Sequence, residues 1–212
     1  IMAALAAVKS GAGLVTVGTD RENIPALHSH LPEAMAFSLQ DQQLLKEQLE
    51  KAEVVLVGPG LRDDAFGEEL VKQVFANLSQ NQILIVDGGA LTILARISLS
   101  FPSNQFILTP HQKEWEKMSG IAIEKQKEAA TASALTFFPQ GTILVEKGPA
   151  TRIWQVGQSD YYQLQVGGPY QATGGMGDTL AGMIAGFVGQ FRQASLYERV
   201  AVATHFHSAI AQ

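Results

Sequence analysis

The chain has 212 residues, of which 46% are hydrophobic and 17% charged, so it can bury a sizeable core and is not expected to be disordered. Its formal net charge of −5 and the lack of any run of Lys or Arg argue against a nucleic-acid partner. Without cysteine it has neither disulfides nor thiolate metal sites, which favours a cytoplasmic protein, and no apolar run is long enough to place it in a membrane.

Both ends of the sequence have the pattern of a helix. Residues 3–9 are apolar and are followed by Ser-Gly-Ala-Gly, which predicts a helix with a glycine C-cap, and residues 201–212 repeat an alanine-rich helical pattern. The sequence also starts without an initiator Met. We therefore expect a single domain over residues 1–212 whose natural sequence continues beyond both ends.

Between these ends, short β-branched runs alternate with longer amphipathic ones. The expected strands are residues 14–17, 34–39, 54–57, 83–86, 106–108 and 142–146. The expected helices are residues 41–51, 66–77 and 124–135, and the segment that contains Pro25 and Pro32 is expected to be a loop. Residues 152–156 and 161–165 predict a hairpin at the edge of the sheet. Continuous apolar strands that alternate with helices predict an α/β fold, a three-layer α/β/α domain with a mostly parallel central sheet.

In such a sheet, ligands bind beyond the carboxyl ends of the strands. Glycine-rich or polar loops occupy these positions here, and we expect them to line one rim. They are Gly58-Pro59-Gly60, Asp87-Gly88-Gly89, Thr109-Pro110-His111, Lys147-Gly148-Pro149 and the glycine loop described next.

The most informative segment is residues 171–182, Gln-Ala-Thr-Gly-Gly-Met-Gly-Asp-Thr-Leu-Ala-Gly. Gly174, Gly175 and Gly177 can turn main-chain N–H groups towards a ligand, and a helix that begins there adds the positive end of its dipole. Asp178 is then placed to act as a base on a bound substrate. An ordinary helix with an acidic first turn would look similar, but glycines at 182, 186 and 189 favour close packing beneath a ligand site. The segment lacks the Gly-Lys-Ser/Thr of a P-loop, and it is not a dinucleotide fingerprint.

The other candidates each have a plain alternative. Lys147 either contacts a phosphate or is a solvated turn lysine, and the loop at Gly60 could be no more than the end of a strand. His111 either lines the cleft or is structural. Glu114 would then begin the next helix or cap it.

Other titratable residues also have two interpretations. Asp87 either orients a ligand or caps a turn. His205 and His207 are two positions apart on a predicted helix and so do not share a face, which argues against a metal site. We interpret both histidines, like Trp115 and Trp154, as packing or surface residues.

Taken in order, these loops resemble the ADP/ATP-dependent NAD(P)H-hydrate dehydratase family, the carboxyl-terminal domain of the YjeF type. The stretches that match are residues 10–17, 31–35, 58–61 (Gly-Pro-Gly-Leu), 108–111 (Leu-Thr-Pro-His) with Glu114, Lys147-Gly148 and residues 172–182. The last stretch is the most specific.

The resemblance implies a ribokinase-like fold and repair of hydrated NADH and NADPH (NADHX and NADPHX). In this reaction ADP or ATP, with Mg²⁺, drives phosphorylation of the hydrate hydroxyl, and phosphate then leaves. Bacterial members typically use ADP, and a homo-oligomer such as a tetramer is typical of the family.

The resemblance also assigns roles by position. Gly60, His111 and Asp178 would bind the hydrate, with Asp178 as the catalytic base. The nucleotide would be bound by Lys147, Gly148, Pro149, Ala150 and Thr151 together with Gly174, Gly175 and Gly177. No protein residue is assigned as a metal ligand.

The sequence departs from the family pattern at several positions. Met176 stands where Ser is common, and Gly168 where Asn is common. Asp87-Gly88-Gly89 replaces Asp-Ala-Asp, which puts any role of the second acid in doubt. The amino-terminal glycine-rich strand of the family has no counterpart in the sequence. The alternatives are a small-molecule kinase of the same fold, acting on a vitamin precursor or a sugar, and a non-catalytic nucleotide sensor.

Overall fold

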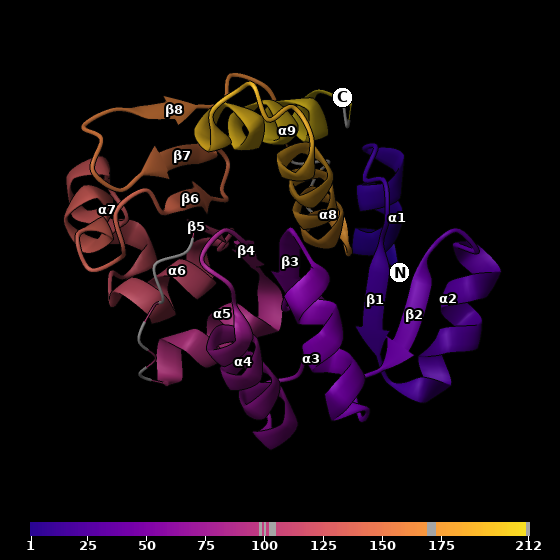
Figure 1. Cartoon of the computed structure of the whole chain (residues 1–212). Helices are drawn as coiled ribbons and strands as arrows, with labels where there is room; N and C mark the ends of the chain where they lie inside the picture. Colours follow the sequence, from indigo (N-terminus) through magenta and orange to yellow (C-terminus); the bar gives the residue numbers. More distant parts are fainter. Residues whose placement is uncertain (98, 100, 102–104, 169–172, 211–212) are drawn as a thin grey trace.

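The central sheet is built from strands between residues 54 and 163 of a computed structural model that describes residues 1–97, 99, 101, 105–168 and 173–210. Within these residues the sheet has six strands in the spatial order β3-β4-β5-β6-β7-β8. They are β3 (Val54–Val57), β4 (Ile83–Val86), β5 (Gln105–Leu108), β6 (Ile143–Glu146), β7 (Arg152–Gln155) and β8 (Tyr161–Gln163). β3 to β6 are parallel, and β7 and β8 form the antiparallel hairpin at the edge (Figure 1), so the mostly parallel sheet is confirmed.

Helices cover both faces of this sheet, and the alternation of side chains along each strand explains why. In β4, Leu84 and Val86 pack on one face, whereas Ile83 and Ile85 pack on the other. The first face is covered by α3 (Gln42–Lys51), α4 (Ala65–Asn77), α5 (Gly88–Arg96), α6 (Gln112–Ser119) and α7 (Glu128–Leu135). The second face is covered by α8 (Met176–Gly189) and α9 (Leu196–Ile210). The predicted three layers are therefore present.

A smaller sheet lies beside the central one. It contains β1 (Thr16–Thr19) and β2 (Met35–Ser38), which pair in parallel and pack with α1 (Met2–Lys9) and α2 (Ile24–His30). Helix α1 lies along α8, as Figure 1 shows, because the glycines of α8 leave room for it. A Cβ on Gly182 would lie 2.1 Å from the carbonyl oxygen of Ala3, so only glycine allows this approach.

Some observed elements differ from the predicted ones. The loop expected around Pro25 is helix α2, because proline is tolerated in the first turn of a helix. The turn expected at residues 87–89 is the start of α5. The helix expected at 124–135 is a short 3₁₀ turn (Ile123–Lys125) followed by α7, and the first strand begins at Thr16 rather than at residue 14.

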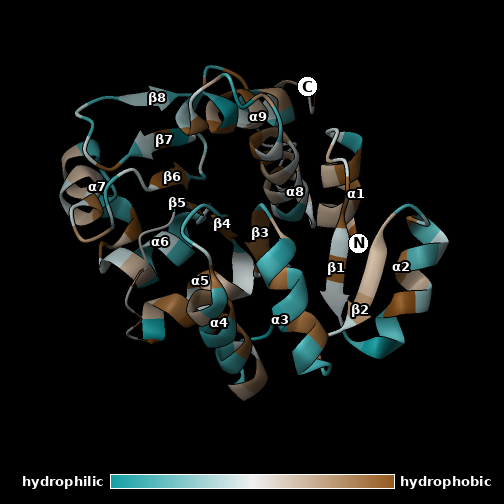
Figure 2. Ribbon diagram, in the orientation of Figure 1, coloured by the Kyte–Doolittle hydropathy of each residue, from teal (hydrophilic) through white to brown (hydrophobic). Residues whose placement is uncertain are grey.

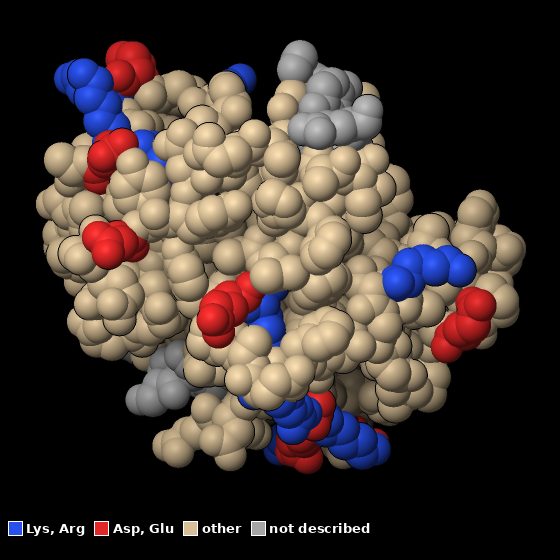
Figure 3. Space-filling model, turned by 90° about the horizontal axis from the view of Figure 1, so that it is seen from above, with Lys and Arg blue, Asp and Glu red and all other residues tan. Residues whose placement is uncertain are grey.

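The surface follows the layering. In Figure 2 the apolar colour lies on strands of the central sheet, while α3 and α4 carry many hydrophilic residues. On the face seen in Figure 3, charged side chains of both signs form small separate groups and most of the area is uncharged. Among the described residues, none of the helices has the length and apolar character required to span a bilayer.

Candidate functional site

The predicted loops lie along one rim of the sheet. Because β3 to β6 are parallel, their carboxyl ends meet at the same edge, where the loops after each strand begin. The loops after β5 and β6 are joined directly. The main-chain N–H of Lys147 donates to the carbonyl of Pro110 at 2.9 Å, and His111 and Lys147 form a parallel β-bridge. This rim is where the sequence predicts a ligand site.

The glycine turn brings the first turn of α8 to this rim. Gly175, the N-cap of α8, has φ +85° and no side chain to cap the helix, so the first N–H groups lack a side-chain partner there. A Cβ on Gly177 would lie 3.3 Å from Nζ of Lys147, which places that ammonium group against the turn. Main-chain donors and one cation together suit an anion. Gln171 and Ala172, which begin the predicted motif, lie outside the described residues.

Lys147 is held by a buried carboxylate. Its Nζ donates to Oδ1 of Asp87 at 2.9 Å, and the Asp87 side chain is only 3% exposed. Thr109, which directly follows β5 between them, donates its hydroxyl to the same oxygen at 2.7 Å. The alternative in which Lys147 is a solvated turn lysine is wrong. Asp87 makes no side-chain capping bond to α5, so it orients Lys147 rather than capping the helix.

Asp178 lies in the first turn of α8 and is partly buried. Burial raises the pKa of its carboxyl group, and the negative charge of Asp87 raises that pKa further, while Lys147 acts in the opposite direction. A carboxylate with a raised pKa binds a proton more tightly and is a better general base. The site therefore combines a cation and two carboxylates of different environments.

His111 and Glu114 form a reciprocal cap at the start of α6. Nδ1 of His111 accepts from the N–H groups of Lys113 and Glu114, both at 3.2 Å, and the carboxylate of Glu114 accepts from the N–H of His111 at 2.8 Å. We assign the ring proton to Nε2 because Nδ1 is the acceptor. The side chain of His111 is 54% exposed, and its Nε2 lies 3.5 Å from Oε1 of Glu114. The structural and the functional interpretations of His111 are thus compatible.

The loop that contains Gly60 packs against the loop of Asp87 backbone to backbone. A Cβ on Gly58 would lie 1.7 Å from the carbonyl oxygen of Asp87, and one on Gly89 would lie 1.9 Å from that of Leu61. Glycine is thus required at both positions, and an acid at residue 89 does not fit this packing. Gly60 itself has φ +71° and open space where a Cβ would be. It leaves main chain accessible at the rim.

The segment after Lys147 is a short exposed turn. Thr151 closes it, since its hydroxyl donates to the carbonyl of Gly148 at 3.2 Å. Pro149 and Ala150 form the exposed tip. The structure therefore places this turn next to Lys147, one of the residues that line the rim.

For three residues near this site the sequence does not reveal the role that the structure shows. It leaves Asp87 between two roles, offers Thr109 only as part of its loop, and predicts that His207 is a packing or surface residue. His207 is 8% exposed, and its Nε2 has no hydrogen-bond partner among the described residues. Burial lowers the pKa of its ring, a contact with the main chain of Met176 partly offsets this, and Lys147 lowers the pKa further. His207 thus lies near both the glycine turn and Lys147, a neighbourhood that no sequence spacing reveals.

No group of three or more His, Cys, Asp or Glu side chains within the described residues is arranged to hold a metal ion. Mg²⁺ at nucleotide sites commonly takes only one or two carboxylates together with phosphate oxygens and water. Of the two rim carboxylates, Asp87 has one oxygen engaged by Lys147 and Thr109, and the hydrogen bonds found for the described residues include none to the side chain of Asp178. The donor set therefore fits a Mg²⁺ ion that is bound together with nucleotide phosphates.

Comparison with known proteins gives matches along the full length of the chain. The NAD(P)H-hydrate dehydratase family profile matches residues 1–212. The chain is 90% identical over its full length to an ADP-dependent (S)-NAD(P)H-hydrate dehydratase of Streptococcus pneumoniae, of which it covers 73%.

Two solved structures are similar. One is a ribokinase-like superfamily protein of Enterococcus faecalis, with a TM-score of 0.91, 40% identity, and coverage of 99% of this chain and 72% of that one. The other is the ADP/ATP-dependent NAD(P)H-hydrate dehydratase of Bacillus subtilis, co-crystallized with ATP and Mg²⁺. It has a TM-score of 0.79, 27% identity, and coverage of 98% of this chain and 73% of that one.

Proposed function

The chain belongs to the NAD(P)H-hydrate dehydratase family, and on that basis we propose that it uses ADP to dehydrate (S)-NADHX and (S)-NADPHX to NADH and NADPH. The observation that carries the proposal is the placement of Asp178, with its raised pKa, beside Lys147 and the glycine turn. The kinase alternative has less support, because the relative that is 90% identical is a dehydratase.

The reaction needs a better leaving group than hydroxide. Asp178 takes the proton of the hydrate hydroxyl, whose oxygen forms a bond to the β-phosphorus of ADP while the bond to the α-phosphate oxygen breaks and AMP leaves. The C–O bond of the phosphate ester then breaks, phosphate departs, and the neighbouring carbon loses a proton. The ring returns to the dihydronicotinamide, and the sum is loss of water from the hydrate with hydrolysis of ADP to AMP and phosphate.

Different rim residues would contact the phosphoryl group and the rest of the nucleotide. Lys147 and the N–H groups around Gly174, Gly175 and Gly177 would stabilise negative charge on the transferring phosphoryl group. The exposed turn from Gly148 to Thr151 would contact the rest of the nucleotide.

The hydrate would lie on the other side of Lys147. There Gly60 offers exposed main chain and His111 an exposed side chain, and a β-bridge joins the loop of His111 to that of Lys147. Mg²⁺ bound with the nucleotide would neutralise charge at phosphate oxygens, and Asp178 is the rim carboxylate that would contact it.

The test is to incubate the protein with Mg²⁺, hydrated NADH or NADPH, and ADP or ATP, and to follow the near-ultraviolet absorbance of the dihydronicotinamide ring. We expect recovery with ADP, with AMP and phosphate appearing in equal amounts. No recovery with either nucleotide, from a preparation shown to be folded, would contradict the proposal. A stable phosphorylated product released instead of NADH would favour the kinase alternative.

Three further expectations belong to the same proposal: a single domain, a cytoplasmic location and a homo-oligomer, specifically a tetramer. For the oligomer, the support is a group of aromatic side chains on α8, on α9 and in the turn that connects them. Phe191 and Phe206 are each about half exposed and both contact Phe187. Light scattering on the purified protein measures the subunit number directly.

A further inference from the structure

A buried ion pair closes the base of the turn between Lys147 and Thr151. Glu146 is the last residue of β6, Arg152 is the first of β7, and the two face each other in the antiparallel register. Nη2 of Arg152 lies 2.8 Å from Oε1 of Glu146, and Nε lies 3.0 Å from Oε2, so the guanidinium contacts both carboxylate oxygens. The side chain of Arg152 is only 15% exposed, and that of Glu146 only 5%. The pair fixes both ends of the turn relative to each other.

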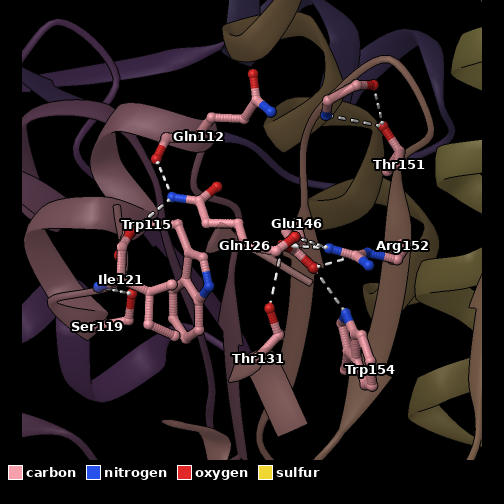
Figure 4. A network of polar contacts seen from close by, with 11 residues as sticks. Gln112, Trp115, Ser119, Ile121, Gln126, Thr131, Glu146, Thr151, Arg152 and Trp154 are labelled. Carbon is pink, nitrogen blue, oxygen red and sulfur yellow. Dashed lines mark hydrogen bonds and ion pairs between the residues drawn. The ribbon is translucent and has the colours of Figure 1, made fainter. Parts of the chain in front are cut away.

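Further donors complete the environment of Glu146, as Figure 4 shows. The indole N–H of Trp154 donates to Oε2 at 2.9 Å, and the hydroxyl of Thr131 donates to Oε1 at 3.3 Å. The guanidinium of Arg152 also lies 5.6 Å from the ring centre of Trp154. The carboxylate therefore has four donors, which keeps the side chain of Arg152 in one orientation.

Arg152 also connects the turn to the segment after α6. Its Nη2 donates to the carbonyl of Gln126 at 2.9 Å, and Nε2 of Gln126 donates to the carbonyl of Gln112 at 2.8 Å (Figure 4). Gln112 follows His111, and its side chain lies 3.9 Å from the position that a Cβ on Gly148 would occupy. The turn is thus held at its base by Arg152 and flanked by Gln112.

The folded state does not require a buried ion pair at this position for its stability. Burying two charges is costly, and well-packed apolar side chains of similar volume are often as stabilising or more so. What the pair offers instead is a fixed geometry, since a guanidinium and a carboxylate meet in one planar arrangement. Its position at the base of the turn proposed to bind the nucleotide gives that geometry a use.

We propose that Arg152 is a positioning residue for nucleotide binding: its pairing with Glu146 and its bond to Gln126 hold the turn at residues 147–151 in the conformation that receives the adenine nucleotide. This rests on the proposed function. Arg152 does not touch the reacting atoms, and it acts by reducing the ordering that the turn must undergo on binding. Such preorganisation raises affinity without changing the chemical step.

The test separates ADP affinity from turnover. Because Arg152→Met alone leaves the carboxylate of Glu146 buried without its cation, the main variant is the charge-free pair Glu146→Gln with Arg152→Met, which keeps both volumes. We expect the Kd and the KM for ADP to rise about tenfold, as for loss of a preorganised contact, with kcat at saturating ADP within about twofold of wild type. Arg152→Lys keeps the charge but not the planar fork, and should give a smaller rise.

The matched control is Arg96→Met, which removes a surface arginine that pairs with Asp63 and Glu68 away from the turn. It should leave the Kd for ADP unchanged. A double variant with a thermal midpoint close to that of wild type and an unchanged Kd for ADP would overturn the positioning role. Failure of the wild-type protein to bind ADP at all would instead overturn the proposed function.

Discussion

Two ion-paired regions of the molecule have nearly the same contact distances but different surroundings. At the rim, Nζ of Lys147 lies 2.9 Å from Asp87, and the two side chains are 19% and 3% exposed. On the outer surface, Arg96 at the end of α5 lies 2.9 Å from Asp63 and 2.8 Å from Glu68, and Arg96 is 50% exposed. Distance alone would rank the two regions as equal.

The titration behaviour of the neighbouring carboxylates shows the difference. Hydrogen bonds from Lys72 and Arg96 lower the pKa of Glu68, as expected for a solvated acid among cations. At the rim, burial and the charge of Asp87 raise the pKa of Asp178 although Lys147 is close. Desolvation outweighs the cation there. The rim thus contains a carboxylate that binds a proton more tightly than usual, whereas Glu68 beside Arg96 binds one less tightly.

The sharpest test of this difference replaces the base. Asp178→Asn keeps the shape of the side chain but removes its charge, so we expect kcat to fall about 10³-fold, within the range for loss of a general base, while the Kd for ADP stays within a few fold. The matched surface variant is Glu68→Gln, which should leave kcat unchanged. Retention of more than about a tenth of the wild-type kcat by Asp178→Asn would show that the base is another group.

The second test concerns stability. Asp87→Ala leaves the ammonium of Lys147 largely buried without its counter-ion, and loss of one partner of a buried pair costs about 3–5 kcal/mol. Since Lys147 keeps some exposure, we expect a fall of about 3 kcal/mol in the free energy of unfolding, measured by urea denaturation. The double variant Asp87→Asn with Lys147→Met removes both charges. It should be nearly as stable as wild type but inactive. Equal stability of Asp87→Ala and wild type would contradict the role of burial.

The sequence predicts the strands that form the rim better than it predicts the helix that begins there. Strands β3 and β4 have the predicted bounds, because four consecutive β-branched or leucine side chains between polar segments fit a buried parallel strand. Since carboxyl ends of parallel strands share an edge, the common rim of the loops could also be predicted. The helix α5 could not, because Gly88 and Gly89 at its start disfavour helix and are required by packing against the loop at residues 58–61.

The sequence could not predict which side chains pair at the rim, and the reason is different. Asp87 and Lys147 are 60 residues apart, and they meet only because β5, with Thr109 at its end, lies between β4 and β6. Strand order is a property of the whole fold, and no local pattern encodes it. His207 is likewise placed by the packing of α9 beneath the sheet, whereas the spacing between His205 and His207 could only argue against a shared metal.

His207 gives a test with a pH readout. Its folded-state pKa is lowered by burial and by Lys147, so between that value and the ordinary pKa of about 6.5 the unfolded chain binds the additional proton. The contribution of this group to stability is therefore fully present above about pH 6.5 and is lost as the pH falls below it. The charged group that acts on the ring is the ammonium of Lys147.

The variant that isolates this contribution is His207→Gln, which is polar but does not titrate. The unfolding free energy of wild type should fall more steeply than that of His207→Gln between about pH 7 and pH 5.5. His28→Gln, at an exposed histidine of α2, is the matched control and should follow the wild type. Parallel pH profiles for wild type and His207→Gln would contradict the burial of a neutral imidazole.

The smallest effect on stability and activity is expected for the ion pairs of Arg96 on the outer surface. Arg96→Ala breaks contacts to two carboxylates at distances equal to those at the rim, yet all three groups keep their hydration, and exposed ion pairs are screened by water and salt. We expect no resolvable change in thermal midpoint at physiological salt and none in kcat or in the KM for ADP. A destabilisation as large as that of Asp87→Ala would mean that short distance, rather than burial, decides the strength of these pairs.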